Sequence, residues 1–99
     1  MDRENRSWYK YFMGCVLYAM GDFGDSLRFL DQSIKEGRSM HSNPIIKRIE
    51  VLLALRKFNE ARAAYAELQQ LNKKYVYVSA SYMQEIEQII IESEQSQKH

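Results

Sequence analysis

The sequence predicts an all-α fold, built from antiparallel helical hairpins that stack into a short α-solenoid of about five helices. Residues that break helices are scarce, because the 99 residues include one proline and four glycines. Apolar residues recur at three- and four-residue spacings along most of the chain, as they do on one face of a helix. The sequence also repeats itself at an interval of 35 residues, which is typical of stacked helical hairpins.

The repeat is clearest around one turn. Residues 21–26 fall on residues 56–61 when the chain is shifted by 35 positions. Leu17 likewise falls on Leu52. These matches lie at apolar positions and at the same turn, so we interpret them as two copies of one structural unit within a single domain that spans residues 1–99.

The first copy, about residues 7–40, is expected to form two helices with a turn near Gly21. Helical spacing of apolar residues is seen before the turn and again after it. These residues are Phe12, Val16, Ala19 and Met20, followed by Leu27, Leu30 and Ile34. Gly24 is expected to cap the second helix. We expect Leu17, Phe23 and Leu30 to be buried.

The second copy, about residues 42–75, is expected to form the next two helices. Asn43 is expected to cap the first of them, with Pro44 at the first helical position, where a missing N–H does no harm. Asn59 is expected to cap the second, as Gly24 does in the first copy. The apolar residues at helical spacing are Ile45, Ile49, Leu52 and Leu53, followed by Ala61, Ala64, Tyr65, Leu68 and Leu71. Leu52, Phe58 and Tyr65 are expected to be buried.

A closing helix is expected over about residues 79–94, after a connection at residues 73–78. Its expected apolar stripe consists of Tyr82, Met83, Ile86, Ile89 and Ile90. The polar tail from Ser93 onward is expected to fray.

Charge and cysteine content argue against several classes of protein. Fourteen basic and thirteen acidic residues give a net charge of +1, without the basic face that nucleic-acid binding requires. Cys15 is the single cysteine, so no internal disulfide can form and a reducing compartment is favoured. No signal peptide and no run of about 18 apolar residues is recognisable. We therefore expect a cytoplasmic protein that does not insert into membranes.

The sequence also lacks a recognisable catalytic or metal site. The two histidines, His41 and His99, have no reactive partner near them in sequence, and Cys15 is expected to be a small apolar residue rather than a nucleophile. No phosphate-binding loop and no zinc-ligand spacing is present. We expect no enzymatic activity, no catalytic residues, no metal and no cofactor.

The helix pairs resemble tetratricopeptide repeats over about residues 7–90. The small residue of a first helix is matched by Gly14, the turn glycine by Gly21 and the turn aromatic residue by Phe23 and Phe58. Ser26 and Ala61 match the small residue that opens a second helix, and Leu30 and Tyr65 match the large residue in its middle. Ile49 and Leu68 depart from the pattern, because small residues are usual there. The resemblance implies a right-handed solenoid of two degenerate repeats plus a closing helix.

The resemblance also implies a concave groove lined by the first helix of each repeat. The groove residues that it implies in the first repeat are Trp8, Tyr11, Cys15 and Tyr18. Those in the second repeat are Asn43, Ile46, Glu50 and Leu53, and those in the closing region are Tyr77, Gln84 and Glu87. The Lys–Asn–Arg set with which some tetratricopeptide proteins grip a peptide carboxylate has no counterpart at these positions. An apolar helix or an extended apolar segment is therefore the expected ligand.

The expected function is a protein-interaction module, an adaptor or chaperone-like unit that holds a protein or peptide segment in this aromatic groove. The alternative is a structural unit that associates with copies of itself and has no separate peptide ligand. Large rings on a short domain fit either possibility, since they can bind a partner or cover the end of a small core.

Overall fold

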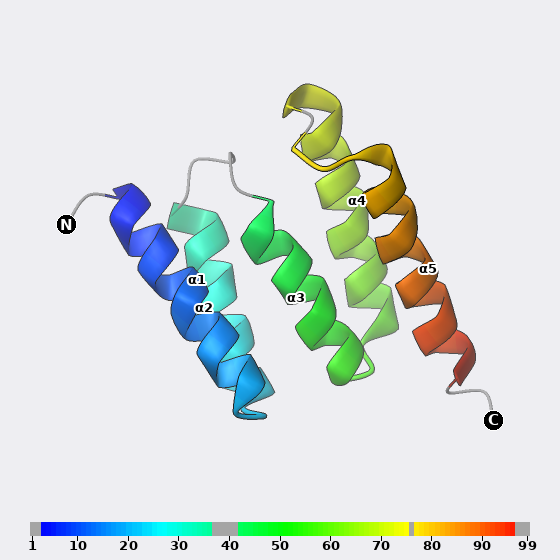
Figure 1. Ribbon diagram of the computed structural model, residues 1–99. Coiled ribbons are helices and arrows are strands. Elements are labelled where there is room, and N and C mark those ends of the chain that lie inside the picture. Colours follow the sequence, from blue (N-terminus) through cyan, green and yellow to red (C-terminus); the bar gives the residue numbers. More distant parts are fainter. Residues whose placement is uncertain (1–2, 37–41, 76, 97–99) are drawn as a thin grey trace.

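The computed structural model describes residues 3–36, 42–75 and 77–96, with side chains described from Arg6 onward. These residues form five helices and no strand (Figure 1). The helices are α1 (Arg3–Ala19), α2 (Phe23–Glu36), α3 (Asn43–Ala54), α4 (Phe58–Tyr75) and α5 (Ala80–Ser96). The predicted all-α fold and helix count are confirmed, whereas the boundary expected near residue 40 lies outside the described residues.

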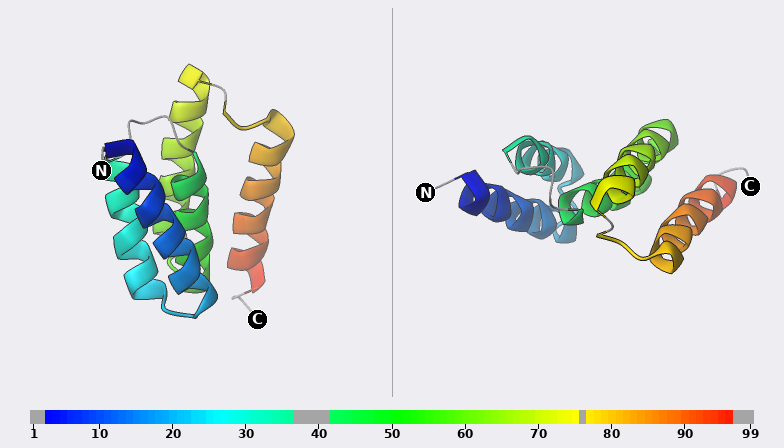
Figure 2. Two further views of the ribbon diagram at one scale, coloured as in Figure 1. Left: turned by 60° about the vertical axis from the view of Figure 1, so that its left-hand side comes forward. Right: turned by 90° about the horizontal axis from the view of Figure 1, so that it is seen from above.

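Consecutive helices run antiparallel and lie side by side, so the chain advances as a row rather than closing into a bundle (Figure 1). Seen from above, α1, α3 and α5 form one layer and α2 and α4 form the other (Figure 2). The molecule measures 47 × 32 × 17 Å along its principal axes. This layering places the first helix of each pair on one common side.

The turns that close the two hairpins are built alike, 35 residues apart. After α1, the N–H of Gly21 donates to the Tyr18 carbonyl and the N–H of Asp22 to that of Leu17, at 3.0 and 2.8 Å. After α3, residues 56 and 57 donate to residues 53 and 52 at the same two distances. Gly21 and Arg56 both have positive φ, of 81° and 60°, as expected for the residue that ends a helix in the left-handed conformation.

Small residues hold α1 against α2. A Cβ atom added to Gly14 would lie 2.7 Å from Cγ and Cδ2 of Leu30, which is fully buried. The Ser26 hydroxyl donates to the Gly14 carbonyl at 2.7 Å. About two helix turns away, the hydroxyls of Ser7 and Ser33 each donate to the other residue's carbonyl, at 2.8 and 2.7 Å. The first hairpin is therefore held together by close backbone approach at Gly14, by the buried Leu30 side chain and by buried hydroxyl hydrogen bonds.

The main apolar core lies among α3, α4 and α5. Its buried residues are Ile45, Ile49, Leu52, Ala61, Ala64, Leu68, Val78, Met83, Ile86 and Ile90. Leu52, Ala61, Ala64 and Leu68 are completely inaccessible to solvent. The core therefore belongs chiefly to the second repeat and the closing helix.

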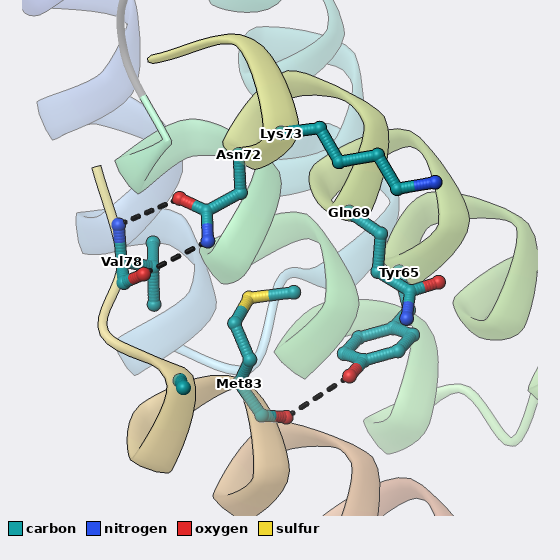
Figure 3. Close-up of a pocket in the computed structure, with 7 residues that line it drawn as sticks. Tyr65, Gln69, Asn72, Lys73, Val78 and Met83 are labelled. Atoms are coloured by element: carbon teal, nitrogen blue, oxygen red, sulfur yellow. Dashed lines mark hydrogen bonds between the residues drawn. The ribbon is translucent and has the colours of Figure 1, made fainter. Parts of the chain in front are cut away.

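The connection between α4 and α5 is clamped by one side chain. The Asn72 amide donates to the Val78 carbonyl and accepts from the Val78 N–H, both at 2.8 Å (Figure 3). Nearby, the Tyr65 hydroxyl donates to the Met83 carbonyl at 3.1 Å. A pocket of about 440 Å³ lies beside these bonds, between α4 and the start of α5. The clamp holds Val78, just before α5, against α4.

Several detailed expectations were wrong. The apolar residues at helical spacing in α1, which are Phe12, Val16, Ala19 and Met20, are exposed, because α1 meets α2 through its small residues instead. Helices α2 and α4 begin at Phe23 and Phe58, so Gly24 and Asn59 lie inside them.

The remaining differences are smaller. The N-cap of α3 is Ser42 rather than Asn43, and its side chain makes no capping bond. Helix α5 extends through Ser96, beyond the point where fraying was expected, and Arg62 of α4 pairs with Glu94 there. Leu30 and Leu52 are buried as expected. Leu17, Phe23, Phe58 and Tyr65 are only half-buried, because each lies at the rim of a two-layer molecule.

Candidate functional site

One hollow is formed jointly by the three helices of the first layer, α1, α3 and α5. It has a volume of about 300 Å³. Its lining consists of Tyr18 from α1, Glu50, Leu53 and Ala54 from α3, and Ile89 and Ser93 from α5. Ile89 is 52% exposed, although it is a large apolar residue on a helix that is otherwise buried on one side. The hollow thus has an apolar floor that is open to solvent.

A polar cluster borders this hollow on the side toward the N-terminus of α1. The Lys47 ammonium lies 2.9 Å from the Glu50 carboxylate and 5.0 Å from the centroid of the Tyr18 ring. Tyr11 and Cys15 lie one turn apart on the same side of α1. We call the surface formed by Tyr11, Cys15, Tyr18, Lys47, Glu50, Leu53, Ala54, Tyr82, Ile89 and Ser93 the groove face.

The pKa of Tyr11 reflects how far this cluster is enclosed by the three helices. Burial raises the pKa of the Tyr11 phenol to about 12, and the hydrogen bond and charge of Cys15, the charge of Glu50 and that of Tyr82 add to the effect. Since Glu50 belongs to α3 and Tyr82 to α5, all three helices act on one hydroxyl. Tyr11 therefore remains neutral and can donate a hydrogen bond at any physiological pH.

Lys47 remains charged in the same cluster. Its partial burial lowers its pKa, but the hydrogen bond to Glu50 and the charge of Glu50 outweigh this effect, and the net shift is upward. The pair therefore presents a fixed cation and a fixed anion at the edge of the apolar hollow.

Aromatic rings continue the groove face along the first turns of α1. The Trp8 ring lies 5.7 Å from that of Tyr11 in an edge-to-face arrangement and 6.0 Å from that of Phe12. Trp8 is half-buried while Phe12 is largely exposed. Trp8 thus marks the boundary between the groove face and the outer side of α1.

The structure brings together most of the groove residues predicted on α1 and α3. Tyr18, Glu50 and Leu53 line the hollow, and Tyr11 and Cys15 adjoin it. Ile46 packs against the apolar core instead of facing the groove. Asn43 is exposed at the first position of α3.

The predicted residues of the closing region lie elsewhere. Tyr77 precedes α5 and stacks on Tyr75 at the end of α4, with ring centroids 5.5 Å apart. Glu87 faces α4, where its carboxylate accepts a hydrogen bond from Tyr65 at 3.3 Å. Gln84 follows Tyr82 by two residues, which is roughly 200° around a helix, so it points away from the groove face. These three residues follow Asn43, Glu50 and Leu53 by 34 residues, and none of them lines the hollow.

Sequence reasoning missed Lys47, Ala54, Tyr82, Ile89 and Ser93. A signal for two of them was present, because Tyr82 and Ile89 are seven residues apart and therefore share a face of α5. That face was assigned to the core together with Met83, Ile86 and Ile90. Only the three-dimensional rotation of α5 separates the two sets.

The groove face offers hydrogen-bonding groups, one ion pair and apolar surface. Among the residues that the structure describes, no group of three or more histidine, cysteine, aspartate or glutamate side chains is placed to hold a metal ion. Within the same residues, no helix has the length and apolar character needed to span a membrane.

Comparison of the chain with protein-family models, with curated proteins and with solved structures finds no significant match.

Proposed function

We propose that this chain is a protein-interaction module that holds an apolar helical or extended peptide segment against the groove face. The observation that carries the proposal is the 52% exposure of Ile89 in a hollow that three helices line together, with Tyr82, 44% exposed, two turns away on the same side of α5. Apolar side chains that surround a shared hollow are typical of surfaces that bind a partner.

The dimensions of the hollow favour a side chain as its occupant. About 300 Å³ is at the lower end of the volumes of small-molecule pockets and is large enough for one or two apolar side chains of a bound segment. Leu53, Ala54 and Ile89 would contact them. Aromatic rings such as Tyr18 and Tyr82 are suitable anchors, because rigid rings contribute large contact area at little entropic expense.

The polar cluster would orient the segment. Glu50 accepts hydrogen bonds and Lys47 and Tyr11 donate them, next to an apolar floor. A peptide backbone or a polar side chain that flanks the apolar anchor would be matched by these groups. The arrangement corresponds to the helix-in-groove and strand-in-groove modes of peptide recognition, in which apolar anchors give affinity and polar edges give register.

The proposal is tested by selecting binders from a library of random 16-residue peptides displayed on phage. Affinity of a selected synthetic peptide is then measured by fluorescence anisotropy for the parent and for Ile89→Ser and Tyr82→Ala. Each substitution should weaken binding by more than about 1 kcal/mol, as loss of an interface anchor does. Because both side chains are about half exposed, helicity by circular dichroism should be retained.

Tyr77→Ala is the matched control. Tyr77 and Tyr82 are 41% and 44% exposed, but only Tyr82 belongs to the groove face. Binding should therefore be unchanged by Tyr77→Ala. Failure to select any peptide, or equal affinity for the parent and the Ile89→Ser variant, would contradict the proposal.

A further inference from the structure

The outer side of α1 carries an apolar stripe that no described helix covers. Tyr9 is 55% exposed, Phe12 59%, Val16 51% and Met20 73%. Met13, half-buried, lies among them. Spacings of three and four residues place all five on one side of the helix, away from the side on which Ser7 and Gly14 meet α2. We call these five residues the outer stripe.

Comparison with the second repeat indicates that this side of the helix can pack against a neighbouring helix. Val16 and Tyr9 correspond to Val51 and Pro44, 35 residues later. Both of the latter are buried, and Val51 is completely inaccessible. On the same flank of α3, Arg48 pairs with Asp31 of α2 at 2.7 Å. The side of α3 that packs against the preceding hairpin therefore corresponds to the exposed outer stripe of α1.

The spacing within the stripe matches a two-stranded helical seam. Tyr9, Met13, Val16 and Met20 follow one another at intervals of four, three and four residues, the alternation found in coiled coils. In an antiparallel pair, Tyr9 lies opposite Met20 of a second copy, and Met13 lies opposite Val16 of that copy. The pattern reads the same from either end, so it is complementary to itself about a twofold axis.

The charges at the two ends of the stripe favour the same arrangement. Arg6 lies one turn before Tyr9, and Asp22 follows the end of α1, and both are exposed. In the antiparallel register each Arg6 lies near Asp22 of the second copy, whereas a parallel pair would bring like charges together. Antiparallel helix dipoles add a smaller favourable contribution.

We infer that the outer stripe is a homodimer interface, in which two copies pair antiparallel through α1 with Arg6 of each beside Asp22 of the other. Five side chains present less area than the roughly 800 Å² that each partner buries in a stable complex. The dimer is therefore reversible, and its population depends on protein concentration. The groove face lies on another side of α1 and stays open in this dimer.

Sedimentation equilibrium of the full chain, from micromolar to millimolar concentration, tests the inference. The parent should show a reversible monomer–dimer equilibrium. Val16→Glu and Met20→Lys should each weaken dimerisation by about tenfold or more, because a charge is then desolvated in the seam. Ile89→Glu is the matched control for Val16→Glu, because Ile89 is 52% exposed and Val16 51%, but Ile89 lies on the groove face. This variant should leave the dimer intact.

A charge exchange tests the orientation. Arg6→Asp and Asp22→Arg should each weaken the dimer, and the double variant should restore it. Restoration requires that the two positions meet across the interface, which a loss of structure in either variant would not produce.

Three results would overturn the inference. One is a parent that remains monomeric throughout the concentration range. Another is a dimer that survives Val16→Glu and Met20→Lys but is lost in Ile89→Glu, which would place the interface on the groove face. The third is loss of helicity in both stripe variants at dilution where the parent is monomeric, since that would make the stripe part of the monomer's own core.

Discussion

Gly14 is the residue at which α1 and α2 approach most tightly. The atoms that a methyl group there would meet belong to Leu30, a fully buried side chain with little room to move. The Ser26 hydroxyl bond to the Gly14 carbonyl depends on the same close approach. The absence of a side chain at Gly14 thus determines how closely α1 and α2 approach each other.

Gly14→Ala should therefore destabilise the protein by roughly 1–3 kcal/mol, as overpacking of a tight contact does. Urea unfolding followed by circular dichroism measures the change. Gly24→Ala provides the control, because no atom lies within 4 Å of the added methyl group and alanine favours the helix. Equal stability of the two variants would show that the hairpin is not closely packed at Gly14.

Because of Tyr11, the free energy of unfolding should change with pH in the alkaline range. The pKa of Tyr11 is about 12 in the folded chain, against 10.0 for an unperturbed tyrosine. Between these values the unfolded chain has lost a proton that the folded chain keeps, so stability falls as pH rises through this window. Below it both states hold the proton, and the contribution is fully present.

Urea midpoints measured from about pH 9 to about pH 12 should therefore fall more steeply for the parent than for Tyr11→Phe, which has no phenol proton to lose. Taking the difference between the two proteins cancels the titration of other groups, such as Tyr65, whose pKa burial and Glu87 also raise. Parallel pH profiles would mean that Tyr11 is as accessible in the folded chain as in the unfolded one.

At the scale of elements, the two hairpin turns make the same backbone hydrogen bonds but have different residues at the left-handed position. Gly21 adopts positive φ without strain, whereas Arg56 adopts it with a side chain. The repeated hydrogen bonds show that the conformation is imposed by the turn and not by the residue.

Substitutions at these two positions should therefore have opposite signs. Gly21→Ala should destabilise by roughly 1–2 kcal/mol, and Arg56→Gly should stabilise by up to about 1 kcal/mol, because a left-handed conformation is unfavourable for residues with a Cβ atom. Thermal and urea unfolding measure both. Destabilisation by Arg56→Gly would indicate that the arginine side chain contributes more than its backbone strain removes.

The Asn72 clamp holds the chain at the start of α5 against α4, and the Tyr65 hydrogen bonds and the Arg62–Glu94 pair join the same two helices. Asn72→Ala removes two hydrogen bonds and should destabilise docking of α5 by roughly 1–3 kcal/mol.

Hydrogen exchange followed by mass spectrometry should then show faster exchange in α5, with α3 less affected. Gln70→Ala, at an exposed position of the same helix, should leave both unchanged. If hydrogen exchange became equally faster in all helices, α5 would not open separately from the rest of the molecule.

The whole molecule is a row of helices with one principal core, to which Leu52 is central. Leu52 is fully buried among residues of α3, α4 and α5. Leu52→Ala should therefore destabilise by roughly 2–5 kcal/mol, enough to unfold much of a domain this small.

Ile89→Ala, at a half-exposed position, should change stability by less than about 0.5 kcal/mol. Chemical unfolding measures both variants. A loss below about half a kcal/mol for Leu52→Ala would mean that the core lies elsewhere.

The sequence by itself predicted the helices, the 35-residue repeat, the burial of Leu30 and Leu52, and that Tyr11, Cys15 and Tyr18 share one side of a helix. These follow from local rules, because helical periodicity and turn geometry depend on residues close together in the chain.

Only the tertiary structure decided which side of each helix meets a neighbour. Phe12 and Val16 are as apolar as any core residue, yet α2 packs where Gly14 and Ser7 allow closer approach. Gln84 and Glu87 follow Glu50 and Leu53 by 34 residues but do not line the hollow, because the rotation of α5 depends on its own contacts with the preceding helices. Periodicity shows that a helix has an apolar side, but the partner of that side is fixed by contacts between residues far apart in the chain.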